Sequence, residues 1–163
     1  MERIVVGMAD CRVSADPQSA LVTYALGSCL GLTVYDPVAR IGGLLHYMLP
    51  DSSLDAGGSG WNPFKFADTG IPRLLEDISE QGASTRRLVV CVAGAAQILD
   101  DKRLFEIGKR NYLAARRLLW KHGLLPASEA VGGTVFRTVS LEIARGRVVV
   151  QEAGRPCELN RTR

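Results

Sequence analysis

The strongest constraint on the fold lies in residues 21–50, where three apolar runs of strand character are separated by two turn signals. The first run ends at Gly27. The second is divided from the third by Asp36-Pro37, a dipeptide that favours a tight turn. We therefore expect the chain to fold back here, with the second and third runs paired as an antiparallel hairpin.

This hairpin decides which side chains face each other. If its turn is centred near Val38, antiparallel register places His46 opposite Leu30, give or take one residue. Facing Cβ atoms in such a pair lie roughly 4.5–5.5 Å apart, so the imidazole reaches the neighbourhood of the Cys29 thiol. A thiol beside a general base is what nucleophilic catalysis by cysteine needs.

The two residues before Cys29 are small, so Gly27 and Ser28 predict a tight turn whose backbone N–H groups face a carbonyl under attack and stabilise its oxyanion. A thiol of pKa about 8.5 is only a few per cent ionised at neutral pH. His46 is therefore expected to serve both as base and as positive neighbour. Taken alone, a cysteine before a strand is usually buried and inert, and a histidine in an apolar strand is usually a hydrogen-bonded core residue.

Short motifs follow one another in a characteristic order along the chain. They are G-S-C, Y-D-P, G-G and H-Y-M-L-P within residues 27–50, I-G-K-R-N at 107–111, and V-G-G-T at 131–134 followed by Arg137. Together they resemble the CheD family of bacterial chemotaxis receptor glutamine deamidases, from about residue 6 to about residue 150. One departure is visible, because A-G-A at 93–95 stands where that family usually has G-G-A.

The resemblance implies a catalytic triad of Cys29, His46 and Thr23. Thr23 by itself would pass as an ordinary β-branched strand residue. The implied activity is deamidation of glutamine side chains in methyl-accepting chemotaxis receptors, whose helical methylation regions would be the protein substrate. The implied fold is similar to that of the cytotoxic necrotizing factor deamidases. Covalent chemistry of this kind calls for neither a metal nor a cofactor.

Two function classes stay open at this point. The first is the protein-glutamine deamidase. The second is a chemotaxis adaptor that binds a CheC-type phosphatase, as some members of the family do, with or without catalysis. An intact Cys and His favour the enzyme. A cysteine amidase or peptidase with another substrate is a third, weaker interpretation.

Further candidates for substrate binding lie outside the triad. Residues 51–62 are rich in glycine and follow the His46 run directly, so a lid over the site with Trp61 as its apolar anchor and a plain surface connection are equally favoured. A predicted helix at 102–122 is strongly basic. Such a charge run is more often a solvated helix face, and the functional alternative is a docking surface for an acidic partner that includes Arg110 and Arg117. Asn111 interrupts that face, and a local contact with the backbone is its expected role.

Composition and spacing bound the fold class. The 163 residues, 47% hydrophobic and 23% charged, fit a single domain over residues 1–163 with a frayed basic tail from about residue 153. Strand patterns alternate with two amphipathic helices, at 63–81 and 102–122. The order predicts an α+β fold in which a layered mixed or antiparallel sheet system packs against two main helices.

Charge and cysteine content point to a cytoplasmic chain without nucleic-acid or membrane functions. The net charge of +3 is too mild to predict a nucleic-acid binder, and no apolar run reaches membrane-spanning length. Four cysteines show neither C-x-x-C spacing nor a cluster with histidine, so free thiols are expected and no metal site.

Overall fold

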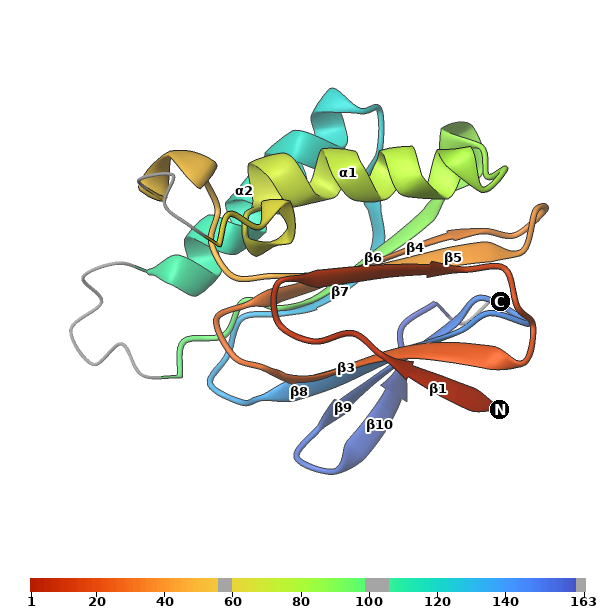
Figure 1. Ribbon diagram of the computed structural model, residues 1–163. Coiled ribbons are helices and arrows are strands. Elements are labelled where there is room, and N and C mark those ends of the chain that lie inside the picture. Colours follow the sequence, from red (N-terminus) through yellow and green to blue (C-terminus); the bar gives the residue numbers. More distant parts are fainter. Residues whose placement is uncertain (56–59, 99–105, 161–163) are drawn as a thin grey trace.

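The computed structural model describes residues 1–55, 60–98 and 106–160, and its strands form two five-stranded sheets packed face to face (Figure 1). In spatial order the first sheet holds β1 (Glu2–Val5), β3 (Ser19–Leu26), β8 (Arg137–Glu142), β9 (Arg147–Glu152) and β10 (Arg155–Glu158). The second sheet holds β2 (Asp10–Ser14), β5 (Ile41–Tyr47), β4 (Leu30–Asp36), β6 (Val89–Gly94) and β7 (Pro126–Val131). Both sheets are mixed, which confirms the predicted α+β class.

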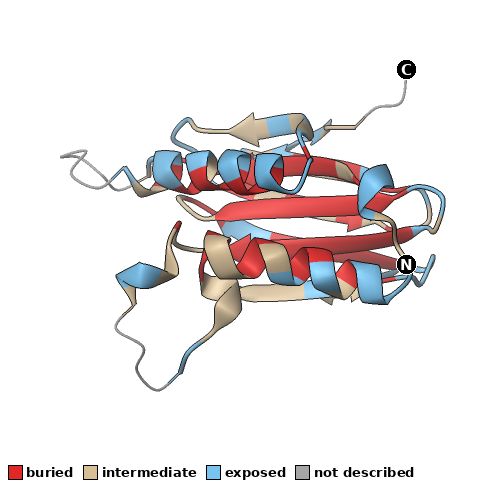
Figure 2. Cartoon of the chain, turned by 90° about the horizontal axis from the view of Figure 1, so that it is seen from above, coloured by how far each residue is buried: buried red, intermediate tan, exposed pale blue. Residues whose placement is uncertain are grey.

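Two helices cover the outer face of the second sheet. α1 (Ala67–Glu80) and α2 (Ile107–Lys121) lie over the buried strands and carry exposed residues along their outer faces (Figure 2). α1 starts later than the predicted residue 63, because Pro63–Lys65 forms a separate 3-10 turn. Pro72 lies inside α1. Residues 102–105 of the predicted second helix lie outside the described residues. No helix in the described part of the chain is long and apolar enough to cross a membrane.

The predicted hairpin is formed by β4 and β5. Asp36 pairs with Ile41, and His46 pairs with Gly31, one residue from the expected partner. The turn is closed by the Asp36 carboxylate, which accepts hydrogen bonds from two backbone N–H groups of the turn at 2.9 and 3.1 Å. It also accepts from Arg87, so a fully buried charge is paired and hydrogen-bonded.

Three strands that the pattern did not predict are β2, β7 and β10. All three lie at the edges of the sheets, where a strand is held by its one neighbour and needs no continuous apolar pattern. β10 also corrects the expected frayed tail, because residues 155–158 pair with β9 in antiparallel register. Short 3-10 turns at Ser52–Leu54 and Thr85–Arg87 complete the described elements.

The hydrophobic core has two layers, separated by the second sheet. One layer lies between that sheet and the helices and includes Leu45 and Tyr47. The other lies between the two sheets and includes Leu44, with Cys29 packed against it. Because side chains alternate along a strand, His46 points with Leu44 into the layer between the sheets.

Candidate active site

Residues 27–29, called here the Cys29 turn, carry the chain from β3 in the first sheet to β4 in the second (Figure 1). Just before the turn, the β3 register shifts after Thr23, and Ala25 takes a left-handed conformation with φ 56°. Such a bulge re-aims a strand, and bulges are common beside functional sites. The turn lies at the end of the sheets where β5 and β6 also end.

Thr23 and His46 come from different sheets and meet in the layer between them. The Thr23 hydroxyl oxygen lies 2.7 Å from His46 Nδ1 and 2.7 Å from the carbonyl oxygen of Val6. Because a carbonyl only accepts, the single hydroxyl proton is donated to Val6, and Thr23 accepts from a protonated Nδ1. The lone pair of the neutral ring is then on Nε2. That atom is buried and has no hydrogen-bond partner among the described residues, so it is available to accept a proton.

Gly31 permits the close approach of the two sheets at this point. It pairs with His46 and has no side chain beside the imidazole. A Cβ atom at Gly31 would lie 2.8 Å from Leu26 Cδ1 and 3.7 Å from Thr23 Cγ2. A larger residue would push β3 away from β5, and the hydrogen bond between Thr23 and His46 would lengthen or break.

Burial governs the protonation of the thiol and the imidazole. Desolvation lowers the pKa of His46 to about 4, so the ring is neutral at pH 7. Desolvation also raises the pKa of the Cys29 thiol, against the smaller lowering effect of its own backbone N–H. The positive charge that the sequence predicted on His46 is therefore absent at neutral pH. The resting pair is a neutral thiol and a neutral imidazole.

All three carbonyls of the Cys29 turn are tied to the protein interior. Gly27 O accepts a hydrogen bond from Ala96 N–H at 2.8 Å, and Cys29 O accepts one from Ala95 N–H at 2.8 Å. Ser28 O accepts one from Asn111 Nδ2 at 2.9 Å. In a trans peptide the C=O and N–H groups point in opposite directions. The N–H groups of Ser28 and Cys29 consequently point away from the interior, and no other described residue accepts a hydrogen bond from either, while the Cys29 N–H also lies near its own sulfur. Such outward donors beside a thiol can receive an oxyanion.

Gly94 makes this anchoring possible. Its φ of 107° is one that glycine adopts readily, and a Cβ atom there would lie 2.3 Å from the Cys29 carbonyl oxygen. Ala93, which replaces a glycine of the family pattern, is a buried strand residue paired with Gly31. The close backbone approach therefore falls on Gly94, and the methyl group of Ala93 is accommodated.

Asn111 is fully buried beneath the turn. Its Nδ2 donates to Ser28 O and to Met48 O, both at 2.9 Å, while its Oδ1 has no partner among the described residues. Asn111 does contact the backbone, but the predicted contact was a local one, and the observed partners lie 83 and 63 residues away in the sequence. Its predicted contact with substrate remains a prediction, and the side chain has no exposed surface in this structure.

The other predicted binding residues are exposed. Trp61 stacks on Phe66 with 5.5 Å between ring centroids. Arg110 and Arg117 lie seven residues apart on α2, which places them on one flank of the helix, about 100–120° around its axis from Asn111. Their part in substrate binding remains a prediction. Residues 56–59 of the predicted lid lie outside the described residues.

Several residues that support the site were not singled out in the sequence. Gly31 and Gly94 are two of them, and Tyr47 is a third, with its hydroxyl donating to the Asn111 carbonyl at 2.6 Å. Arg137, noted there only as part of a motif, is buried and donates from Nη1 to Gly94 O at 3.1 Å. Tyr47 and Arg137 belong to the quoted motifs and Gly94 to the A-G-A string, whereas Gly31 belongs to none. Their contacts join segments that no local pattern connects.

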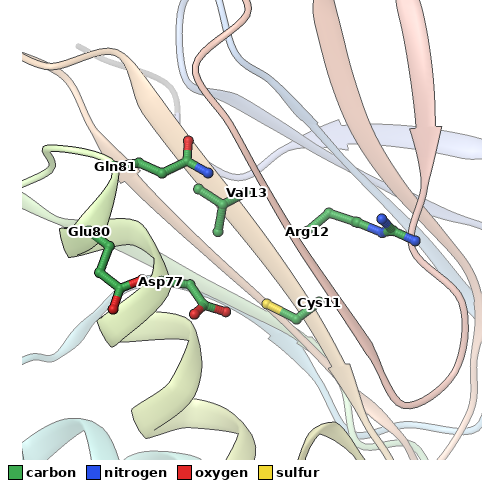
Figure 3. Close-up of a pocket in the computed structure, with 6 residues that line it drawn as sticks. All are labelled: Cys11, Arg12, Val13, Asp77, Glu80 and Gln81. Carbon is green, nitrogen blue, oxygen red and sulfur yellow. The ribbon is translucent and has the colours of Figure 1, made fainter.

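A surface hollow of about 520 Å³ lies away from this site, between β2 and the end of α1 (Figure 3). Its lining residues are Cys11, Arg12, Val13, Asp77, Glu80 and Gln81. Burial, aided by Asp77 and Asp10, raises the pKa of the Cys11 thiol to about 12, which makes it a poor nucleophile. In the described part of the chain, no three His, Cys, Asp or Glu side chains form a group that could hold a metal ion.

Thr23 orients a neutral imidazole, and the strand register places His46 opposite Gly31, two residues after Cys29 and its outward backbone donors. Among the described residues, no hydrogen bond joins the Cys29 sulfur to His46 Nε2. Hydrolases that cleave an amide through attack by cysteine use catalytic groups of these kinds. The fold is α+β, and the residues around the Cys29 turn are of the kinds that a cysteine hydrolase would use.

Comparison with known proteins identifies the family. A family model described as CheD chemotactic sensory transduction matches residues 48–152. The chain is 58% identical over 159 residues to the probable chemoreceptor glutamine deamidase CheD of Solibacter usitatus, covering 98% of this chain and 94% of that protein. It is 47% identical over 156 residues to the probable chemoreceptor glutamine deamidase CheD 1 of Syntrophus aciditrophicus, covering 96% and 98%. The chain belongs to the CheD family, and the resemblance predicted from its motifs is confirmed.

Proposed function

We propose that this chain converts specific glutamine side chains of chemotaxis receptors to glutamate, with Cys29 as nucleophile, His46 as general base and Thr23 as the residue that orients His46. The observation that carries the proposal is the Thr23–His46 hydrogen bond, which leaves the lone pair of the imidazole on its buried Nε2, on a strand residue paired with Gly31, two residues after Cys29. The names of the relatives supply the substrate class. The protein works in the cytoplasm, where receptor signalling regions lie.

The first half of the reaction forms a thioester. As the Cys29 sulfur attacks the amide carbon of the glutamine, its proton passes to His46 Nε2, and the carbonyl oxygen becomes an oxyanion held by the Ser28 and Cys29 N–H groups. The imidazolium then donates this proton to the amide nitrogen. The C–N bond breaks and ammonia leaves.

The second half regenerates the enzyme. A water molecule attacks the thioester carbon while neutral His46 takes one of its protons. The resulting oxyanion collapses, the C–S bond breaks and the sulfur recovers its proton from His46. One amide and one water thus give one carboxylic acid and one ammonia, and Cys29 is unchanged.

Arg110, Arg117 and Trp61 are proposed to contact the receptor. Glutamates created by deamidation make the receptor segment acidic, and cationic side chains on one flank of α2 attract such a segment. The double change Arg110→Glu and Arg117→Glu should raise KM for receptor several-fold and make it less dependent on salt. A charge-matched control at the far end of the sheets, Arg86→Glu with Arg145→Glu, should leave KM unchanged.

The direct test uses purified receptor cytoplasmic fragments incubated with the protein and examined by mass spectrometry. Each converted glutamine gains about 1 mass unit, because an amide NH₂ is replaced by OH. Peptide mapping then names the modified positions. If no receptor fragment gains mass at any enzyme concentration tested, the proposed function is refuted.

A further inference from the structure

An exposed aromatic ring lies against the Cys29 turn. Phe136 belongs to the connection between β7 and β8, at the same end of the sheets as the turn (Figure 1). Its side chain is 56% exposed, yet its ring packs directly on Gly27, because a Cβ atom there would lie 3.0 Å from Phe136 Cε1. Ile98 approaches the same point, at 3.2 Å. The turn is thus bordered on this side by apolar groups, two residues from Cys29.

The connection that carries Phe136 is braced from within. The buried guanidinium of Arg137 donates to Gly132 O at 2.7 Å and is paired with Glu152. Gln97 N–H donates to Gly133 O at 2.9 Å. A ring on such a braced connection is held in one place, so it offers contact area with little further loss of conformational entropy on binding.

From these contacts we propose that Phe136, with its exposed neighbour Val135 and with Ile98, forms a docking surface for the receptor segment that presents the target glutamine. The inference rests on the proposed function. A glutamine side chain is short, so the backbone that delivers its amide to Cys29 must pass over the border of the turn. Because this border is apolar, it fits an apolar receptor side chain about one helical turn from the glutamine.

This occupant is favoured over a second copy of the chain. A receptor segment must cover the turn in every catalytic cycle, whereas a copy seated there would exclude the substrate. Large aromatic side chains near the centre of an interface also carry much of the binding energy. Phe136 is therefore assigned as a residue that determines which glutamines are used.

The test compares Phe136→Ala with Trp120→Ala, a control in which an exposed aromatic is removed from the outer face of α2. Steady-state kinetics are measured on one receptor fragment. The rate of Cys29 alkylation by iodoacetamide is measured in a Cys157→Ser background, because Cys157 is exposed. We expect Phe136→Ala to raise KM for the fragment about tenfold, as loss of a hot-spot ring does. Phe136→Leu should recover part of the effect, and Trp120→Ala should leave KM unchanged.

Each other outcome has a definite meaning. An unchanged KM in Phe136→Ala, or an equal rise in Trp120→Ala, overturns the docking surface while the deamidase stands. A fall in Cys29 alkylation that matches the loss of deamidation also overturns it, because the ring would then merely support the turn. If the wild-type protein deamidates no receptor fragment, it is the proposed function that fails.

Discussion

Replacing Thr23 by alanine should leave a slow but measurable deamidase. The hydroxyl makes one neutral hydrogen bond to the imidazole and one to the carbonyl of Val6. Threonine carries no charge with which to stabilise the imidazolium, in contrast to the aspartate of a serine protease triad. A neutral hydrogen bond contributes about 1 kcal/mol, which corresponds to roughly a fivefold loss of rate.

The same substitution has a cost in stability. It leaves His46 Nδ1 and the Val6 carbonyl without their partner in a buried layer, and each such group costs about 1–3 kcal/mol. In a domain of this size 1 kcal/mol lowers the melting temperature by about 2–4 °C. Thr23→Ala should therefore melt several degrees below wild type. Thr23→Val, which fills the space without the hydroxyl, should lose rate similarly, and Thr23→Ser should stay near wild type.

The assay is the initial deamidation rate on one receptor fragment, with melting followed by circular dichroism. Cys29→Ala and His46→Ala serve as references that should show no measurable deamidation. If folded Thr23→Ala is as fast as wild type, another group orients His46. If folded Thr23→Ala is as inactive as His46→Ala, the hydroxyl does more than orient the ring, and this result also refutes the reasoning.

Three further predictions concern the surroundings of the triad. Asn111→Ala should lower kcat about tenfold, which is less than the effect of removing an oxyanion-hole donor itself. The rate of Cys29 alkylation should be unchanged. Equal losses in kcat and in the alkylation rate would mean general damage to the site. Only neutral His46 accepts a proton, and its pKa is about 4, so kcat/KM should stay level from pH 8 to 6 and fall as pH drops through about 4. A fall of kcat/KM centred near pH 6.5 would contradict the argument that burial lowers the His46 pKa. Arg87 and backbone donors hold the pKa of Asp36 far below its usual value, so this carboxylate stabilises the fold above pH 4 and loses that effect in acid. Asp36→Asn should thus melt well below wild type at pH 7, with a gap that narrows in acid, and a gap independent of pH would refute this role.

The hairpin could be predicted because its information is local. Asp36 marks the turn, and the apolar runs on either side set the register to within one residue, which brings His46 within two residues of Cys29. The position of Thr23 could not be derived in this way. It reaches His46 across the gap between two sheets, and only the resemblance to a family placed it in the site.

Two kinds of feature escaped local patterns altogether. The edge strands β2, β7 and β10 are polar or half-buried, so their pairing is decided by the neighbouring strand and not by their own periodicity. Asn111 was expected to contact backbone, but its partners Ser28 and Met48 lie 83 and 63 residues away. The protonation state of His46 also depended on burial, which spacing alone does not reveal.

The central claim is that Cys29 alone among the four cysteines performs the reaction. The most direct measurement compares Cys29→Ala with Cys11→Ser, Cys91→Ser and Cys157→Ser on one receptor fragment, with glutamine conversion counted by mass spectrometry. We predict no conversion by Cys29→Ala and conversion by each of the other three variants that remains folded. Conversion by folded Cys29→Ala at the wild-type rate would contradict the account.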